Sequence, residues 1–324
     1  MRRVLGLTLT GLGAFFLALA LLLRFYLPGQ VIKFPLNEYL VTTLTGHHVS
    51  YFSQKQGTVL TGVNAKATST IEGDVAAGSG SVAVWNDFTA VEDTTNNGPI
   101  QYQSQRSAFD RRSGEIVDCC GAYVSVSNVG SHTAGQSGLA YAFPIGTQKQ
   151  TYQVFDPTLA RPEPFRYAGT ATIDGVSTLK FVERVTNQQF AQQQLPGTLV
   201  GYPDQPTVTL PEYLTETKTF WVDPATGEPV DVAQDETLAL ENAAGATKLV
   251  LFKGDLAATP QSIAGAIGAV NSSHLKIEFV EDIGPLVSLL LGVLLLVLGI
   301  ALTVNQPDLE EFEYESDEPV GSTT

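Results

Sequence analysis

The sequence has few groups that could build a metal centre. It contains two cysteines and four histidines among 324 residues. The cysteines are the neighbours Cys119 and Cys120, and no second cysteine-rich element or histidine at ligand spacing accompanies them. The adjacent His47 and His48 fit a loop better than a ligand pair. We therefore expect neither a metal site nor a cofactor.

Familiar catalytic motifs are also missing. The sequence contains no Gly-x-Ser-x-Gly elbow, and Gly135-Gln136-Ser137-Gly138 lacks the spacing that this elbow requires. It contains no Walker motif and no glycine-rich dinucleotide motif. We therefore expect a protein that is not an enzyme.

Basic residues are scarce. There are 18 lysines and arginines against 33 acidic residues, a net charge of −15, and such a surface repels phosphate, so we expect no nucleic acid among the partners. The C-terminal tail (305–324) is acidic and too polar to fold alone. It is either a solvated terminus or a dock for a basic cytoplasmic surface, with Phe312 and Tyr314 as anchors.

Two long runs carry no charge: Val4 to Leu23 and Ile283 to Val304, of 20 and 22 residues. As helices they reach about 30 and 33 Å, the thickness of a bilayer core. The first run is longer than a signal-peptide core, and Arg24 to Pro28 follows it in place of a cleavage site. We therefore predict uncleaved transmembrane helices at 4–27 and 283–304.

Arg2 and Arg3 precede the first span. Because the cytoplasmic flanks of membrane spans are enriched in lysine and arginine, the positive-inside rule places residues 1–3 in the cytoplasm. Two spans return the chain to the same side. The expected protein is thus a two-pass protein of the cell membrane, with both termini in the cytoplasm and residues 28–282 outside.

Small residues recur every fourth position in both spans. The second span has Gly284, Ser288 and Gly292, and the first has Gly6, Thr10, Ala14 and Ala18. Such ridges allow close approach, so the helices either pack together or bind the helices of other envelope membrane proteins. The alternative is that small residues are simply common in membrane helices. Neither span has an ionisable residue in its core, so the chain alone is not expected to be a transporter.

The block between the spans is rich in strand patterns. Apolar and polar residues alternate in Ser81 to Trp85, Thr237 to Leu240 and Lys248 to Phe252, with glycine, proline, asparagine and aspartate between the runs. We predict a mainly β extracytoplasmic domain of twisted antiparallel sheets. One short helix is expected near 260–271, capped by Thr259, followed by a last strand from Leu275 to Val280.

The block also has internal echoes. The pattern Asp-x-x-Ser/Thr-Gly-Glu-x-Val-Asp occurs at Asp110 to Asp118 and again, 113 residues later, at Asp223 to Asp231. Upstream, Thr70 to Gly73 resembles Thr172 to Gly175 at an offset of 102. Each longer pattern predicts a hairpin turn. Two echoes in the same order favour a duplication, with repeats at 28–155 and 156–282, in two sheets or one continuous sheet.

The adjacent cysteines leave two possibilities open. On a regular strand their side chains point to opposite faces, so a vicinal disulfide requires a local turn, which Gly121 could help to form. The alternative is a pair of reduced or separately paired thiols.

Several motifs together resemble the actinobacterial family labelled porin PorA. They are Phe109 to Glu115 running into Cys119-Cys120-Gly121, then Phe143 to Thr147 leading to Tyr152 and Phe155-Asp156-Pro157, and finally Phe220 to Gly227. The resemblance implies a span, ectodomain, span layout and a role in cell-envelope growth and glycolipid handling. It carries over no catalytic residue. A pore would need a membrane barrel or many polar-lined helices, which two apolar spans do not offer, so we expect no pore.

The stretch Lys218 to Val230 is similar to a hairpin of periplasmic lipoprotein carriers, in which a curved antiparallel sheet encloses an apolar groove. The duplicated unit would then be lipoprotein-carrier-like. We expect a non-catalytic, membrane-anchored ectodomain that binds an envelope lipid or glycolipid, or alternatively a scaffold subunit of an envelope transport or wall-synthesis complex. The expected groove residues are Trp85, Phe88, Phe181 and Trp221, whose alternative role is ordinary sheet core.

Overall fold

The computed structural model describes residues 2–127, 130–132 and 135–304. They form two compact units. One contains the described parts of residues 1–31 and 277–324, and the other contains residues 32–276. The expected anchors Phe312 and Tyr314 lie outside the described residues.

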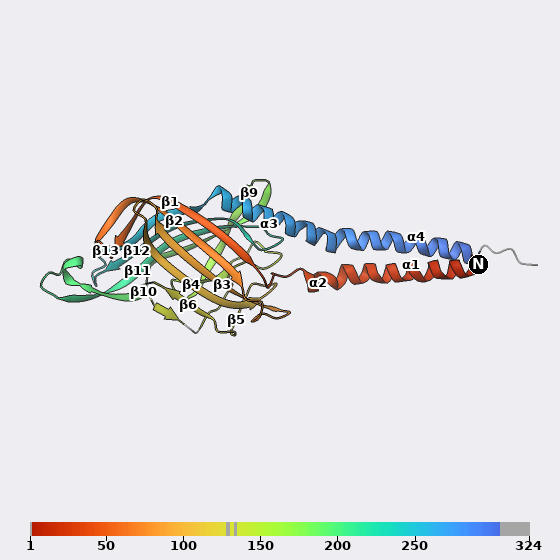
Figure 1. The fold of residues 1–324 in the computed structure, drawn as a ribbon, viewed down its shortest axis with the longest axis horizontal. Helices are drawn as coiled ribbons and strands as arrows, with labels where there is room; N and C mark the ends of the chain where they lie inside the picture. Colours follow the sequence, from red (N-terminus) through yellow and green to blue (C-terminus); the bar gives the residue numbers. More distant parts are fainter. Residues whose placement is uncertain (1, 128–129, 133–134, 305–324) are drawn as a thin grey trace, which may run out of the picture. The chain divides into compact units, whose positions relative to one another are not determined.

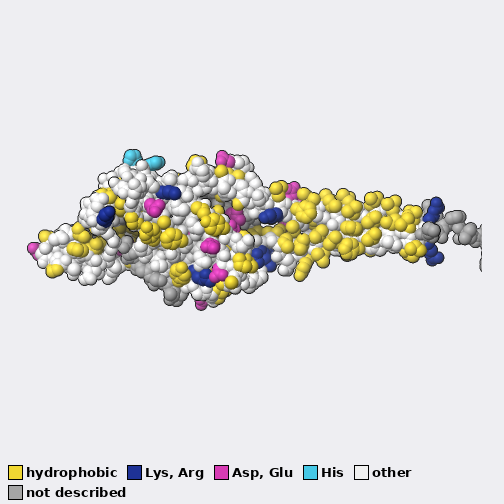
Figure 2. Space-filling model, in the orientation of Figure 1, with side chains coloured by type: hydrophobic (Ala, Val, Ile, Leu, Met, Phe, Trp, Pro, Cys, Tyr) yellow, Lys and Arg dark blue, Asp and Glu magenta, His cyan; other side chains and the backbone are white. Residues whose placement is uncertain are grey.

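The first unit is helical. Its elements are α1 (Arg2–Phe25), α2 (Leu27–Val31), the π-helix η2 (Phe279–Ile283) and α4 (Gly284–Val304). Helix α1 and the continuous helical stretch Pro260–Val304 are long and apolar enough to cross a membrane. Hydrophobic side chains cover the exposed surface of α1 and α4 (Figure 2). Both helices are therefore compatible with membrane anchoring.

Helices α1 and α4 pack against each other through small residues. A Cβ atom on Gly13 would lie 2.6 Å from the Leu296 nitrogen, and one on Gly292 would lie 2.9 Å from the Leu17 backbone. Gly292 and Ser288 are buried, and Gly284 is partly buried. The ridge of the second span therefore serves contact within the chain.

The ridge expected in the first span is at the contact only in part. Gly6 and Thr10 lie against α4, because a Cβ atom on Gly6 would lie 3.0 Å from the Gly299 oxygen and one on Gly299 would meet Thr10. Ala14 and Ala18 are exposed, whereas Gly6, Gly13 and Ala20 are buried. A spacing of four residues drifts around a helix of 3.6 residues per turn, while a spacing of seven nearly returns to the same face. The contact with α4 therefore follows a seven-residue spacing.

The second unit is built on one antiparallel sheet that contains the thirteen strands of the described residues, in the order β7-β6-β4-β3-β2-β1-β13-β12-β11-β10-β9-β8, with β5 beside β4. The curved arrangement is visible in Figure 1. The strands are β1 (Tyr39–Ser53), β2 (Thr58–Gly73), β3 (Val82–Asp93), β4 (Gly98–Asp110), β5 (Ile116–Val117), β6 (Tyr123–Val126), β7 (Gly130–His132), β8 (Tyr152–Asp156), β9 (Arg161–Ile173), β10 (Val176–Pro196), β11 (Thr207–Val222), β12 (Pro229–Glu241) and β13 (Thr247–Ala258). A 3₁₀ turn, Gly197–Val200, follows β10.

The first and last strands of the domain join its two halves. β1 pairs with β13, for example at Tyr51 and Phe252, so strands from both halves form one continuous sheet. The echoed tetrapeptides lie at the ends of β2 and β9, and the echoed hairpin turns follow β4 and β11, two strands later in each half. The duplication itself stays a prediction, but the echoes occupy corresponding places in the strand order.

Strand β9 changes partner along its length. Its residues from Arg166 onward pair with β10, whereas Arg161 to Phe165 pair with β8. Leu139 bridges the other side of β8 through its hydrogen bonds with Gln153 and Phe155. The β8–β9 hairpin (152–165) is therefore held by β9 and by the segment around Leu139.

The two predicted hairpin turns are confirmed. The Asp110 carboxylate accepts hydrogen bonds from the backbone N–H groups of Arg112 and Ser113, each at 2.9 Å. The Asp223 carboxylate accepts one from the Thr226 N–H at 2.9 Å. Gly114 and Gly227 both have positive φ angles, 73° and 78°. Aspartate opens each turn and glycine closes it, as turn chemistry requires.

The end of the domain departs from the predicted short helix and strand. Helix α3 runs from Pro260 to Glu278 and continues through η2 into α4. The N–H of Ser262 donates to the Thr259 hydroxyl at 3.2 Å, so the predicted cap is confirmed. The predicted strand from Leu275 to Val280 is wrong. An alternation of six residues is too short to exclude a helix, and no glycine or proline interrupts the chain between Gly268 and Gly284, so the helix continues through it.

His47 and His48 lie in β1 and not in a loop. The pairing register shifts between Gly46 and Val49, and His48 has a φ angle of 58°. The two histidines thus occupy a bulge, which keeps a locally irregular backbone inside a strand. His47 Nδ1 lies 2.8 Å from the Asn64 side-chain oxygen.

Candidate functional site

A cavity of about 320 Å³ lies on the inner face of the sheet. Strands from both halves line it, together with residues 140–143, the β8–β9 hairpin, and Ser262 and Ala266 of α3. Much of its wall is apolar, including Leu44, Ile71, Phe143, Phe165, Phe220 and Leu256. A volume of this size is at the lower end of the range for small-molecule sites. The cavity can therefore enclose part of a ligand in an apolar environment.

A band of polar side chains crosses the apolar wall. Gln101, Gln103 and Gln105 lie on alternate positions of β4, so they share one face of that strand. Gln234 and Glu236 of β12 also line the cavity. The cavity therefore offers hydrogen-bonding groups as well as apolar surface.

Asp87 of β3 adds a buried carboxylate to this band. It accepts hydrogen bonds from the hydroxyl groups of Ser69, at 2.5 Å, and Thr89, at 3.1 Å. Burial raises the pKa of Asp87, and the two hydroxyl groups oppose this shift. Two fixed donors therefore hold this acid in position on the cavity wall.

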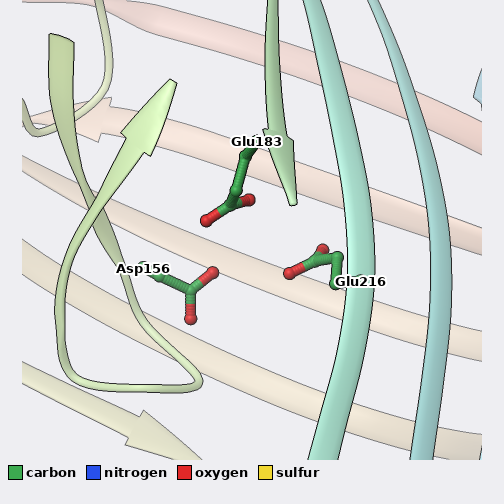
Figure 3. Close-up of side chains that lie close together, drawn as sticks. All are labelled: Asp156, Glu183 and Glu216. Carbon is green, nitrogen blue, oxygen red and sulfur yellow. The ribbon is translucent and has the colours of Figure 1, made fainter. Parts of the chain in front are cut away.

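A charged cluster lies beside the cavity. The ammonium group of Lys218 (β11) is 3.2 Å from an Asp156 oxygen (β8), 3.1 Å from a Glu216 oxygen (β11) and 3.8 Å from a Glu183 oxygen (β10). Figure 3 shows the three carboxylates turned toward a common space. Asp156 and Lys218 also line the cavity. The cluster thus connects the cavity wall to the hairpin that covers part of it.

Negative groups outnumber positive ones in this cluster. Asp156, Glu183, Glu216 and Glu236 are all buried, and Lys218 is the cation among them. Neither oxygen of Glu183 has a hydrogen-bond partner among the described residues. Burial raises the pKa of Glu183 and of Glu236 to about 8 and that of Glu216 to about 7. Buried carboxyl groups without enough counter-charge take up protons, because an isolated buried charge is costly.

The oxygens of Asp156, Glu183 and Glu216 lie within 4.8 Å of one another, a spacing that a metal ion could bridge. Lys218 already contacts all three carboxylates. Its ammonium group therefore takes the place that a metal ion would need, and the arrangement is better described as a charge network than as a metal centre.

Two of the four expected groove residues are core residues. Trp85 packs against Phe109 with ring centroids 4.8 Å apart, and its indole N–H donates to the Pro35 carbonyl at 3.1 Å. Phe181 is fully buried and stacks on Phe143 at 4.7 Å. Neither is among the residues that line the cavity. The structure thus places both in the sheet core, the alternative role considered for them.

The other two lie away from the cavity. Phe88 is 49% exposed and stacks on Tyr102, while its strand neighbours Asp87 and Thr89 line the cavity. Trp221 is contacted by the Lys180 ammonium group at 5.2 Å from its ring centroid, and its neighbour Phe220 lines the cavity. Successive side chains of a strand point to opposite faces, so these two aromatics are on the other face of the sheet.

Cys119 and Cys120 form a disulfide between neighbouring residues. Cys120 and Gly121 have φ angles of 64° and 72°, which is the local turn that such a bond requires. The Nε group of Arg106 donates to the Cys120 carbonyl at 3.0 Å. The pair lies after β5 and does not line the cavity.

Sequence reasoning missed Lys218 and the four carboxylates around it. They come from four strands, and β8 is separated from β12 by more than seventy residues of sequence. On β11, Glu212, Glu216 and Lys218 share the inner face with Leu210, Leu214 and Phe220. From Thr215 to Thr219 both faces of the strand are polar, so alternation in this stretch does not show which face is inside. The unusual number of charged residues on one face of β11 is the sequence signal that could have identified this cluster.

The structure defines a β-rich domain in a chain with two candidate membrane spans. The family model of Porin PorA matches residues 5–301, and the chain belongs to this family. Membership suggests an envelope protein. A solved structure, a beta-barrel-like protein of a domain of unknown function from Brucella abortus, is 12% identical, with a TM-score of 0.17, and the match covers 68% of this chain and 95% of that one. No curated protein matches the chain.

Proposed function

We propose that the protein is a non-catalytic, membrane-anchored envelope protein whose β domain binds a lipid or glycolipid and presents it or passes it on. The observation that carries this proposal is the cavity on the inner face of the sheet. Its apolar wall can exclude water from an acyl chain, and burial of apolar surface yields about 25 cal/mol per Å².

The polar band supports the same proposal. The Gln103 side chain lines the cavity and makes no hydrogen bond to another described residue, so its amide group can bind a ligand. Asp87 and Glu236 line the cavity too. A ligand with an apolar chain and a head group rich in hydroxyl groups would satisfy both kinds of wall, because buried polar groups need hydrogen-bond partners.

Two substitutions on neighbouring residues test the proposal. Gln103 faces the cavity and pairs with Thr89, whereas Ser104 pairs with Phe88 on the other face of the same strand. Gln103→Trp would fill part of the cavity, and Ser104→Trp would add the same side chain outside it. Both variants are made in the full chain and extracted gently from the native membrane.

Mass spectrometry then identifies the lipids that each protein retains. We expect a specific envelope lipid at near-stoichiometric amount in the wild type and in Ser104→Trp, and a loss of at least half of it in Gln103→Trp. Retention of only bulk phospholipid, at the level of an unrelated two-span protein, contradicts the proposal. Equal retention in the two variants would show that the lipid lies elsewhere.

A further inference from the structure

The β8–β9 hairpin borders the cavity, and its strand β8, which carries Asp156 of the charged cluster, is the last strand in the sheet order. The other acidic members, Glu183, Glu216 and Glu236, come from β10, β11 and β12, which pair with one another over long registers. These three strands cannot separate without breaking the sheet. Asp156, in contrast, ends the five-residue strand β8, which pairs with β9 over a short register at the edge of the sheet.

The attachment of the hairpin to the sheet includes one ion pair. Lys218 reaches from β11 to Asp156 at 3.2 Å, and both side chains line the cavity. Apolar contacts of Tyr152 with Phe143, of Phe155 with Val124 and of Phe165 with Phe220 also hold the hairpin. A break of the ion pair would therefore loosen the hairpin at the point where it borders the cavity.

The charge balance of the cluster depends on bound protons. With Glu183, Glu216 and Glu236 protonated, Lys218 and Asp156 form a balanced pair. When these three groups ionise, one ammonium faces four carboxylates in a buried region, and the like charges repel one another. The groups that face this region from each packed element are Asp156 of β8, Glu163 of β9, Glu183 of β10, Glu216 and Lys218 of β11, and Glu236 of β12.

Repulsion among the ionised carboxylates displaces the one that is held least firmly, which is Asp156 in the edge strand β8. Glu183 and Glu216 compete with Asp156 for the same ammonium group, and they are fixed in the sheet. Ionisation would therefore displace Asp156, and the hairpin with it. Protonation would restore the balanced pair and close the hairpin over the cavity.

We propose that the Asp156–Lys218 ion pair is a proton-controlled latch, which holds the β8–β9 hairpin over the cavity and is released when the neighbouring carboxyl groups lose their protons. As a regulator of ligand access the latch rests on the proposed function. Its movement, however, can be measured without any ligand.

Hydrogen exchange of the full chain in detergent micelles, with rates corrected for the intrinsic effect of pH, tests the latch. The reporter is the Phe155 amide, which donates to the Leu139 carbonyl at 2.9 Å. We expect its protection to fall about tenfold or more between pH 6 and pH 8.5, the change that one pKa unit of coupling produces. Amides in the β11–β12 pairing serve as the internal reference and should change much less.

Three variants complete the test. Glu183→Gln removes one ionisable group and should keep the hairpin protected at pH 8.5. Asp156→Asn removes the latch and should reduce protection already at pH 6. Glu92→Gln, at an exposed position of β3, should behave like the wild type.

The latch is contradicted if protection at Phe155 is the same at both pH values, if all strands lose protection equally, or if Glu183→Gln follows the wild type. Failure of the proposed function looks different, because the protein would retain no specific lipid whether or not the hairpin opens with pH.

Discussion

The backbone N–H of Phe143 donates a hydrogen bond to the carbonyl oxygen of Gly227 at 2.9 Å. This bond joins the segment that lines the cavity to the turn between β11 and β12. A Cβ atom on Gly227 would collide with the Phe143 carbonyl oxygen. The equivalent turn after β4 makes a similar contact, because the Ala140 N–H donates to the Gly114 carbonyl at 3.0 Å. Glycine at each turn thus lets residues 140–143 approach the sheet.

Gly227→Ala should therefore destabilise the protein more than Gly175→Ala. Both glycines have positive φ angles, 78° and 89°, so both substitutions cost about 1 to 2 kcal/mol for the backbone alone. Only Gly227 faces a close neighbour, whereas nothing lies within 4 Å of a Cβ on Gly175. Overpacking adds about 1 to 3 kcal/mol at Gly227. Equal midpoints in urea unfolding would contradict this account of the turn.

The helix pair offers a second matched comparison. Gly13→Leu would push a side chain into the backbone of α4 at Leu296, whereas a Cβ on Gly11 meets nothing within 4 Å. We expect Gly13→Leu to lower the thermal unfolding temperature of the helices in detergent, with a cost of about 1 to 3 kcal/mol, and Gly11→Leu to leave it unchanged. The account of α1–α4 packing fails if Gly13→Leu is as stable as Gly11→Leu.

The buried carboxyl groups predict how stability depends on pH. Glu183 and Glu236 keep their protons up to a pKa of about 8 in the folded protein, whereas the unfolded chain loses them near 4.5. Between these values the unfolded state binds fewer protons, so the free energy of unfolding decreases as pH rises. We expect the melting temperature of the β domain, followed by circular dichroism of the full chain, to be higher at pH 5.5 than at pH 8.5.

Glu183→Gln should make this pH dependence shallower, because it removes one of the responsible groups. The exposed Glu92→Gln variant is the control and should reproduce the wild-type slope. A melting temperature that rises with pH over this interval would show that the cluster is ionised and balanced in the folded state, contrary to our description.

The parts of this fold that sequence predicts are those set by local chemistry. The Asp110 and Asp223 turns, the Thr259 cap and the two apolar helices each depend on a few adjacent residues. The sequence does not decide between one sheet and two, because the pairing of β1 with β13 joins segments that are about two hundred residues apart.

The site was harder to predict because it depends on which face of each strand is inside. Trp85 and Phe181 are expected in the groove, yet they fill the core, where large apolar side chains bury the most surface. Gln103 and Lys218, which line the cavity, are polar, and the sequence pattern alone does not distinguish them from surface residues. Local alternation could not identify them, since register and curvature decide which face closes over the cavity.

The most direct test of the cavity as a lipid site is site-specific photo-crosslinking in the native membrane. Benzoylphenylalanine is placed at Gln103 or at Ser104, adjacent residues on opposite faces of β4, and adducts are identified by mass spectrometry after irradiation. Our account predicts a lipid adduct at position 103 and none, or far less, at position 104. Absence of a lipid adduct at 103, or equal labelling at both positions, would contradict it.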